Sequence, residues 1–283
     1  PLGLKNEIHY RARSKAEAIN KWMRDYGDKY DFVGIFDADS DVELPFYPKI
    51  LEYFDDKTAF VQSKIKGKEG FLKDLVEWYF DNRIKEPFLS MGHNVVFRTE
   101  VLRKYPLPEG MGEDFLYTFE LWYRGYSSKL AEDVISYENT PPNLISFLRR
   151  DIKYAGLELK YILNLPKLWK AKIPLMKKVE VTIDILRAPI IFIILVALLY
   201  NALYLKNVLI LLVAFILGII VIRAKPKSLI LLPFMFNSIV GFILGVRYLK
   251  SKEFIPSSKY RVPVPLLLLS VYIWISILIM FFI

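Results

Sequence analysis

Three alternating acids end an apolar run of strand length early in the chain. The segment reads DFVGIFDADSD, so Asp37, Asp39 and Asp41 follow the apolar residues 32–36. Residues two apart beyond a strand end point to the same side, so Asp37 and Asp39 can direct two carboxylates to one point. Mg²⁺ or Mn²⁺ is often held by one or two carboxylates together with substrate phosphates. The pattern therefore indicates either a metal–diphosphate site or a simple turn, because Asp and Ser also favour turns.

A second pair of acids, Glu113 and Asp114, follows two glycines and opens a predicted helix. Acids in the first turn of a helix are stabilised by the helix dipole, which is the structural interpretation. The functional interpretation is a general base, because a carboxylate beside a phosphate-rich site can take a proton from an attacking hydroxyl.

A basic group, Arg149, Arg150 and Lys153, forms the third feature. Cations near a departing diphosphate would stabilise its developing charge. Contact with lipid head groups is the alternative, because residues 144–178 alternate apolar and aromatic residues with Arg and Lys. That pattern is typical of amphipathic helix at a membrane surface, although an ordinary solvated helix would also fit it.

The elements that must position these residues alternate between strand and helix patterns. A capping box, Ser14-Lys-Ala-Glu17, predicts a helix start. Strand-like runs are predicted over 32–36, 58–65, 91–98 and 130–137, with helical patterns between them. This order predicts an α/β layer structure with a mainly parallel sheet. Ligands of such sheets bind beyond the carboxyl ends of the strands, which is where Asp37 and Asp39 lie.

Hydropathy divides the 283-residue chain into three parts: residues 1–143, the amphipathic residues 144–180, and the apolar residues 181–283. Apolar stretches occupy 185–205, 208–222, 228–249 and 264–283. Because about 20 apolar residues cross a membrane core of ~30 Å, we expect about four membrane segments. The number of true crossings stays open, because Lys- and Arg-rich loops flank the third stretch on both sides and both favour the cytoplasm.

Charge and composition exclude several classes of protein. The chain has no Cys and two His, which excludes a disulfide framework and any Cys-based zinc site. Its formal charge of +9 accompanies an apolar tail, as is typical of cytoplasmic surfaces beside anionic lipid. No RNA-reading motif accompanies the basic residues, so no nucleic-acid partner is predicted. The sequence indicates no oligomeric state.

In chain order these motifs resemble the family-2 glycosyltransferases, and within them the membrane-embedded branch of cellulose-, hyaluronan- and osmoregulated-glucan-synthase-like enzymes. The matching segments are Lys15-Ala-x-Ala-Ile-Asn20, Phe36-Asp-Ala-Asp-Ser40, Gly92-His-Asn-x-x-Phe-Arg98, Gly112-Glu-Asp114 and Arg150-Asp-Ile-Lys-Tyr154. The resemblance covers about residues 10–160. It implies an incomplete GT-A (Rossmann-like) α/β domain followed by transmembrane α-helices. The family's opening strand and its base-gripping acid are expected to lie upstream of Lys15, so an N-terminal truncation is expected.

The resemblance also implies a role for each matching residue. Asp114 would be the catalytic base with Glu113 beside it, and Asp37 and Asp39 would hold Mg²⁺ or Mn²⁺ on the nucleotide diphosphate. The remaining donor-side residues would be Lys15, Asn20, Arg150 and Lys153, and the acceptor-side residues would be Gly92, His93, Asn94 and Tyr154. Arg150, Lys153 and Tyr154 stand where the family has Gln-x-x-Arg-Trp, which leaves chain elongation in question.

We therefore predict a membrane-embedded, inverting, metal-dependent glycosyltransferase. It would move a sugar from a nucleotide-sugar donor to a polysaccharide or lipid-linked acceptor, with a cytoplasmic catalytic domain in a multi-pass cell-membrane protein. The alternative is a non-catalytic membrane scaffold subunit with a truncated transferase domain. Retention of the three acids Asp37, Asp39 and Asp114 favours the enzyme.

Overall fold

Two compact units make up the chain. The first contains residues 1–140, 170–172 and 251–254, and the second contains residues 141–169, 173–250 and 255–283. The computed structural model describes residues 11–70, 73–186, 190, 262 and 264–265.

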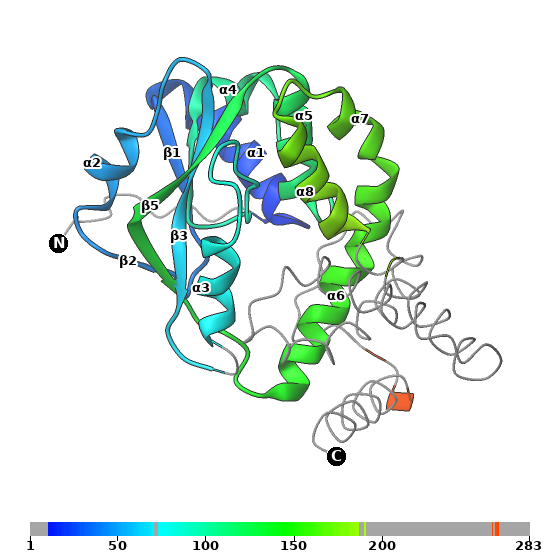
Figure 1. The fold of residues 1–283 in the computed structure, drawn as a ribbon. Helices are drawn as coiled ribbons and strands as arrows, with labels where there is room; N and C mark the ends of the chain where they lie inside the picture. The colour runs from blue at the N-terminus through cyan, green and yellow to red at the C-terminus, as the bar shows by residue number, and fades with distance from the viewer. Residues whose placement is uncertain (1–10, 71–72, 187–189, 191–261, 263, 266–283) are drawn as a thin grey trace. The chain divides into compact units, whose positions relative to one another are not determined.

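A five-stranded sheet forms the centre of the first unit, in the order β1–β4–β3–β5–β2 (Figure 1). The strands are β1 (Phe32–Ile35), β2 (Asp41–Val42), β3 (Thr58–Gly67), β4 (Val95–Arg98) and β5 (Ser127–Glu138). β4 lies between β1 and β3 and runs antiparallel to both. β2 is antiparallel to β5, and β3 with β5 is the parallel pair.

The prediction of a mainly parallel sheet is therefore wrong for the described strands. β1, β3 and β5 do run in one direction, but β4 separates β1 from β3. The apolar run in β4 is buried on both faces of the sheet. A central strand has this composition whichever way it runs, so the sequence pattern does not reveal its direction.

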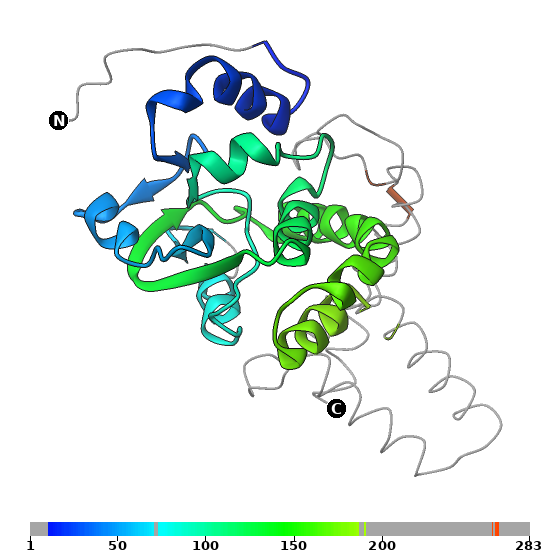
Figure 2. The same cartoon turned by 90° about the horizontal axis from the view of Figure 1, so that it is seen from above.

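Helices cover both faces of this sheet. α1 (Lys15–Tyr26), α4 (Thr99–Lys104) and α5 (Glu113–Tyr123) pack on one face, and α2 (Phe46–Leu51) packs on the other (Figure 2). α3 (Lys73–Asp81) packs against the later part of β3, and the short 3₁₀ helix η1 (Gly27–Lys29) follows α1. The predicted helix over 69–84 is thus shorter in the structure, and α2 was not predicted.

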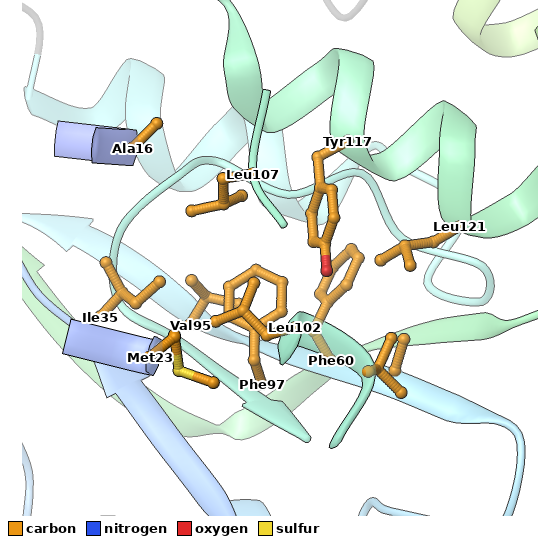
Figure 3. Close-up of a cluster of buried hydrophobic side chains, with 12 residues drawn as sticks. Ala16, Met23, Ile35, Phe60, Val95, Phe97, Leu102, Leu107, Tyr117 and Leu121 are labelled. Atoms are coloured by element: carbon orange, nitrogen blue, oxygen red, sulfur yellow. The ribbon is translucent and has the colours of Figure 1, made fainter. Parts of the chain in front are cut away.

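A cluster of buried apolar side chains joins α1, α4 and α5 to the sheet (Figure 3). Phe97 of β4 lies with its ring 5.2 Å from Phe60 of β3 and 5.9 Å from Tyr117 of α5. Ala16 and Met23 add the buried side of α1. Because this packing holds α1 and α5 on the same face, it also fixes where their N-termini lie relative to the strands.

The second unit contains α6 (Leu144–Leu163), most of α7 (Leu165–Lys170) and α8 (Leu175–Ile185). Helices were predicted over 144–178, and the structure confirms helical structure there. Within the described ranges, no helix is both long enough and apolar enough to span a membrane. The four predicted apolar stretches fall outside the described residues, apart from a few positions at 185–186, 190 and 264–265.

Candidate active site

The candidate site lies at the edge of the sheet where β1, β3 and β5 end. Because these strands run in the same direction, their carboxyl ends share this edge with the amino end of β4. Asp37 follows β1, His93 precedes β4, and Glu138 is the last residue of β5. Ligands of open α/β sheets bind at such an edge, and the predicted position of the site is therefore consistent with the fold.

Two lysines hold the loop that carries the three alternating acids. Lys15, the first residue of α1, forms an ion pair with Asp37. Lys68, just beyond β3, donates a hydrogen bond to the carbonyl oxygen of Asp39 at 3.0 Å and pairs with Asp41. The carboxylates of Asp37 and Asp39 belong to exposed residues, so a ligand from solvent can reach them.

Ser14 is the N-cap residue of α1, as the capping box predicts. Its hydroxyl accepts a hydrogen bond from the Glu17 backbone N–H at 3.1 Å, and Glu17 accepts one from the Arg13 backbone N–H at 2.8 Å. The cap fixes the start of α1, and it is this start that brings Lys15 to Asp37.

His93 is partly buried between two acids. Its Nε2 lies 2.6 Å from Glu138 Oε2, and its Nδ1 lies 2.9 Å from the Met91 carbonyl oxygen and 3.9 Å from Asp37 Oδ2. Both close neighbours accept hydrogen bonds, so the ring nitrogens are best satisfied when both carry protons. Burial lowers the pKa of His93, but the Glu138 carboxylate and then Asp37 outweigh it and the pKa is raised. These contacts thus favour the protonated form of the imidazole within the site.

The sequence did not predict Glu138 as a residue of the site. It stands in an otherwise ordinary strand end, YENTPP, and only the pairing of β5 with β3 carries it to the His93 loop. A carboxylate 45 residues from its partner gives no local signal.

Asp114 lies in the first turn of α5, after Gly112, whose φ is 78°. Its Oδ1 accepts a hydrogen bond from the Phe115 N–H at 2.9 Å. Burial raises the pKa of Asp114, and the Phe115 hydrogen bond and the nearby charges of His93 and Lys15 oppose that rise. A carboxylate with a raised pKa is a better proton acceptor than an ordinary Asp, which suits a general base. Glu113 precedes it in the same turn.

Gly92 brings the His93 loop against Asp114. Its φ is 77°, in the left-handed region that favours glycine, and a Cβ there would lie 3.1 Å from Asp114 Oδ2 and 3.2 Å from Asp114 Cβ. Both the backbone conformation and the close approach to the carboxylate therefore require glycine.

Replacing Gly92 with Ala is expected to reduce sugar transfer by about 100-fold, because displacing a catalytic group by ~1 Å can have that effect. The left-handed conformation alone would cost ~1–2 kcal/mol. Gly125→Ala is the matched control, since Gly125 has a φ of 90° but its added Cβ would meet only the Lys172 side chain, at 3.8 Å. Melting temperatures should show a similar destabilisation of both variants. Initial transfer rates should fall in Gly92→Ala alone. Equal rate losses in the two variants would mean that the contact with Asp114 is unimportant.

Asn20 and Asn94, two residues that were predicted to bind ligands, differ in their contacts. The Asn20 amide donates to the Leu107 carbonyl at 2.8 Å and accepts from the Leu107 N–H at 3.0 Å, which ties α1 to the loop before α5. Asn94 is fully buried with a φ of 53°, and no described residue hydrogen-bonds its side-chain amide. Asn tolerates the left-handed region better than most residues. The donor role of Asn20 and the acceptor role of Asn94 stay predictions.

The remaining predicted residues, Arg150, Lys153 and Tyr154, lie on α6 in the second unit. Their spacing places them on one side of that helix. Lys153 is buried with its Nζ 5.7 Å from the Tyr154 ring centroid, and Tyr154 is half exposed. The structure thus unites Lys15, Asp37, His93, Gly92 and Asp114 in the first unit, whereas the basic and aromatic residues of α6 belong to the other unit.

The residues present fit a divalent cation bound together with a diphosphate. Across the described ranges, no three His, Asp or Glu side chains gather into a metal cluster. Asp37 and Asp39, exposed on one loop, supply two hard oxygen donors, and Mg²⁺ usually completes such a set with phosphate oxygens and water.

Comparisons with known proteins show the family to which the chain belongs. The family model for glycosyl transferase family group 2 matches residues 71–224, more than half of the chain. The chain therefore belongs to glycosyl transferase family group 2, and this membership supports an α/β GT-A-like fold and sugar transfer from a nucleotide-sugar donor. A search of curated protein sequences found no match.

Solved structures similar to the chain include two proteins in complex with nucleotide sugars. The mannosyltransferase PcManGT from Pyrobaculum calidifontis, in complex with GDP-Man and Mn²⁺, is 18% identical with a TM-score of 0.47, and the match covers 84% of this chain and 68% of that one. TarS 1–349 from S. aureus, in complex with UDP-GlcNAc, is 13% identical with a TM-score of 0.41, covering 85% and 64%. Both likenesses are remote, so the family assignment rests on the family model.

Proposed function

We propose that this protein is a membrane-embedded, inverting glycosyltransferase that depends on a divalent cation. It moves a sugar from a nucleoside diphosphate to a hydroxyl of a polysaccharide or lipid-linked acceptor. One observation carries the proposal: a cation-paired acid loop and a partly buried carboxylate meet at one edge of the sheet, where Lys15 pairs with Asp37 and Gly92 packs on Asp114.

In this reaction Asp114 accepts the proton of the acceptor hydroxyl as the acceptor oxygen attacks the anomeric carbon. The new glycosidic bond forms while the bond from that carbon to the diphosphate oxygen breaks, and the electron pair leaves with the nucleoside diphosphate. Attack opposite to the leaving group inverts the anomeric centre. A divalent cation bound at Asp37 and Asp39 would neutralise the diphosphate charge.

The chain's own cations would assist the leaving group. Lys15 lies beside Asp37, and His93 Nδ1 lies 3.9 Å from the same carboxylate, where protonation would give it a positive charge. Fixed positive charge beside a developing negative charge stabilises the transition state without reorganisation. Arg150 and Lys153 are proposed to add to this stabilisation, and Tyr154 with the Gly92–Asn94 loop to border the acceptor.

Membrane embedding rests on the sequence. The apolar stretches 185–205, 228–249 and 264–283 are long enough to span a bilayer, the stretch 208–222 needs flanking residues to do so, and the basic amphipathic region 144–180 suits the cytoplasmic interface. An acceptor held near the membrane, such as a glycolipid, a polyprenyl phosphate or a growing glycan, follows from that placement.

The test is transfer by the full-length protein in lipid nanodiscs. A panel of radiolabelled uridine, guanosine and adenosine diphosphate sugars is offered with Mn²⁺ and with a polyprenyl phosphate, a glycolipid or an oligosaccharide. We expect one donor to label an acceptor, with the activity lost in EDTA and restored by Mn²⁺ or Mg²⁺. Metal-dependent binding of a nucleoside diphosphate without any turnover would instead support the scaffold alternative.

A further inference from the structure

A buried glutamine beneath the candidate site has contacts that its position in a strand does not require. Gln62 lies in β3, opposite Val95 of β4, and its exposed fraction is 0%. Its side chain turns to the loop before β4, where it bonds backbone groups and no other side chain among those described.

Gln62 binds this loop on both sides of Gly92. Its Oε1 accepts a hydrogen bond from the Met91 N–H at 3.0 Å, and its Nε2 donates to the carbonyl oxygens of His93 at 3.0 Å and Asn94 at 2.9 Å. The amide assignment is consistent with its partners, since an N–H faces the oxygen and carbonyls face the nitrogen.

The loop of residues 91–94 needs hydrogen-bond partners such as Gln62 because its backbone does not have a regular strand conformation. Gly92 and Asn94 both have left-handed backbones, with φ of 77° and 53°. Buried backbone N–H and C=O groups that leave a ladder must find partners elsewhere. Gln62 provides one acceptor and one donor group for three of the four residues 91–94, and Ser63 adds hydrogen bonds from its N–H and its hydroxyl to the Asn94 carbonyl.

The loop conformation in turn decides where two site residues lie. Gly92 contacts the Asp114 carboxylate, and the next residue, His93, lies between Glu138 and Asp37. A shift of the loop therefore moves the surface against which the base packs, whereas Lys15 and Asp39 belong to other elements.

We propose that Gln62 is a positioning residue for sugar transfer: it holds residues 91–94 in the conformation that aligns Asp114 with the acceptor hydroxyl. The inference rests on the proposed function and adds to it a residue that touches neither donor nor acceptor. Gln62 acts through the loop, so its loss should affect the transfer step more than nucleotide binding.

The experiment compares Gln62→Met with the wild-type full-length protein. Methionine keeps the volume and removes all three hydrogen bonds to the loop. Calorimetry with a nucleoside diphosphate and Mn²⁺ gives the Kd and the number of competent sites, and kcat is expressed per competent site. We expect an unchanged Kd and a kcat per site lower by on the order of 100-fold.

Two further variants separate positioning from folding. Thr58→Val removes the hydrogen bond from the buried Thr58 hydroxyl to Asp55 Oδ1, which measures 2.7 Å and involves no residue of the 91–94 loop, and should change stability but not kcat per site. Gln62→Glu keeps the acceptor for the Met91 N–H, replaces the donor with a second oxygen facing two carbonyls, and should lose kcat as Gln62→Met does.

If both Gln62 variants had the same kcat per site as the wild type, the inference would be overturned while the proposed function stayed intact. A parallel fall in kcat and in competent sites, with normal kcat per site, would likewise assign Gln62 to folding alone. Nucleotide binding without transfer in the wild type would overturn the proposed function, and the role of Gln62 in transfer with it.

Discussion

Asp114→Asn is expected to lower the rate of sugar transfer by about 10²- to 10⁴-fold, the usual contribution of a positioned general base. The amide has nearly the same shape as the carboxylate and can still accept the Phe115 hydrogen bond, so the first turn of α5 should persist. Because Asp114 does not lie on the acid loop, binding of nucleoside diphosphate with Mn²⁺ should be retained. Single-turnover transfer from a labelled donor, measured beside calorimetry, separates these two effects.

The pH dependence of the transfer rate provides a second test of Asp114. Burial raises the pKa of Asp114 above its ordinary value of 3.8, and a base must be ionised to accept a proton. The wild-type rate should therefore be full above the raised pKa and fall as the pH decreases through it, and this acid limb should disappear in the residual activity of Asp114→Asn.

Asp114→Asn should lower the transfer activity without lowering the stability of the fold. A carboxyl group whose pKa is raised on folding favours the folded state less once it is ionised, so Asp114 opposes folding at neutral pH. Asp114→Asn should then melt at the same temperature as the wild type or higher. Asp28→Asn, at an exposed acid in η1, is the matched control for the chemical change. Wild-type transfer rates in Asp114→Asn would remove this residue from the mechanism.

Asp39→Asn is expected to weaken Mn²⁺-dependent binding of nucleoside diphosphate by more than about 100-fold. Changes in the groups that merely support metal ligands cost 10- to 100-fold, so loss of a ligand charge should cost at least as much. Calorimetric titration with and without Mn²⁺, together with the free-Mn²⁺ signal in electron paramagnetic resonance, measures the loss without needing turnover.

Asp41→Asn is the internal control for that loss. Asp41 belongs to the same acid loop, but it opens β2 opposite Tyr137 and pairs with Lys68. It lies outside the Asp-x-Asp pair, so its substitution should leave Mn²⁺ binding in place. If Asp41→Asn and Asp39→Asn behaved alike, the loop charge as a whole rather than one carboxylate would hold the cation.

Local signals in the sequence were sufficient to predict several features of the site. The capping box at Ser14 places Lys15 at a helix start, and the apolar run before Asp37 places the acids at a strand end. Gly112 before Glu113 and Asp114 marks the start of α5. Each of these signals depends on residues within a few positions of one another, so a short window of sequence contains the physical cause.

Long-range contacts were not predictable in the same way. The bonds from Glu138 to His93 and from Gln62 to the Met91–Asn94 loop join residues about 30 to 45 positions apart. Asn20, which was predicted to bind the donor, forms hydrogen bonds with the backbone of Leu107, 87 positions away. No local pattern distinguishes a Gln or Glu that will find such a partner from one that will face solvent.

The sequence by itself showed membership of a family that transfers sugars, and it predicted two carboxylates for a cation and diphosphate and a third carboxylate as base. The tertiary structure decided which strand separates β1 from β3, and thereby which residues meet. Because β4 runs antiparallel between them, its amino end brings Gly92 and His93 to the edge where Asp37 and Glu138 lie. Strand order depends on packing between distant segments, and neither composition nor periodicity records it.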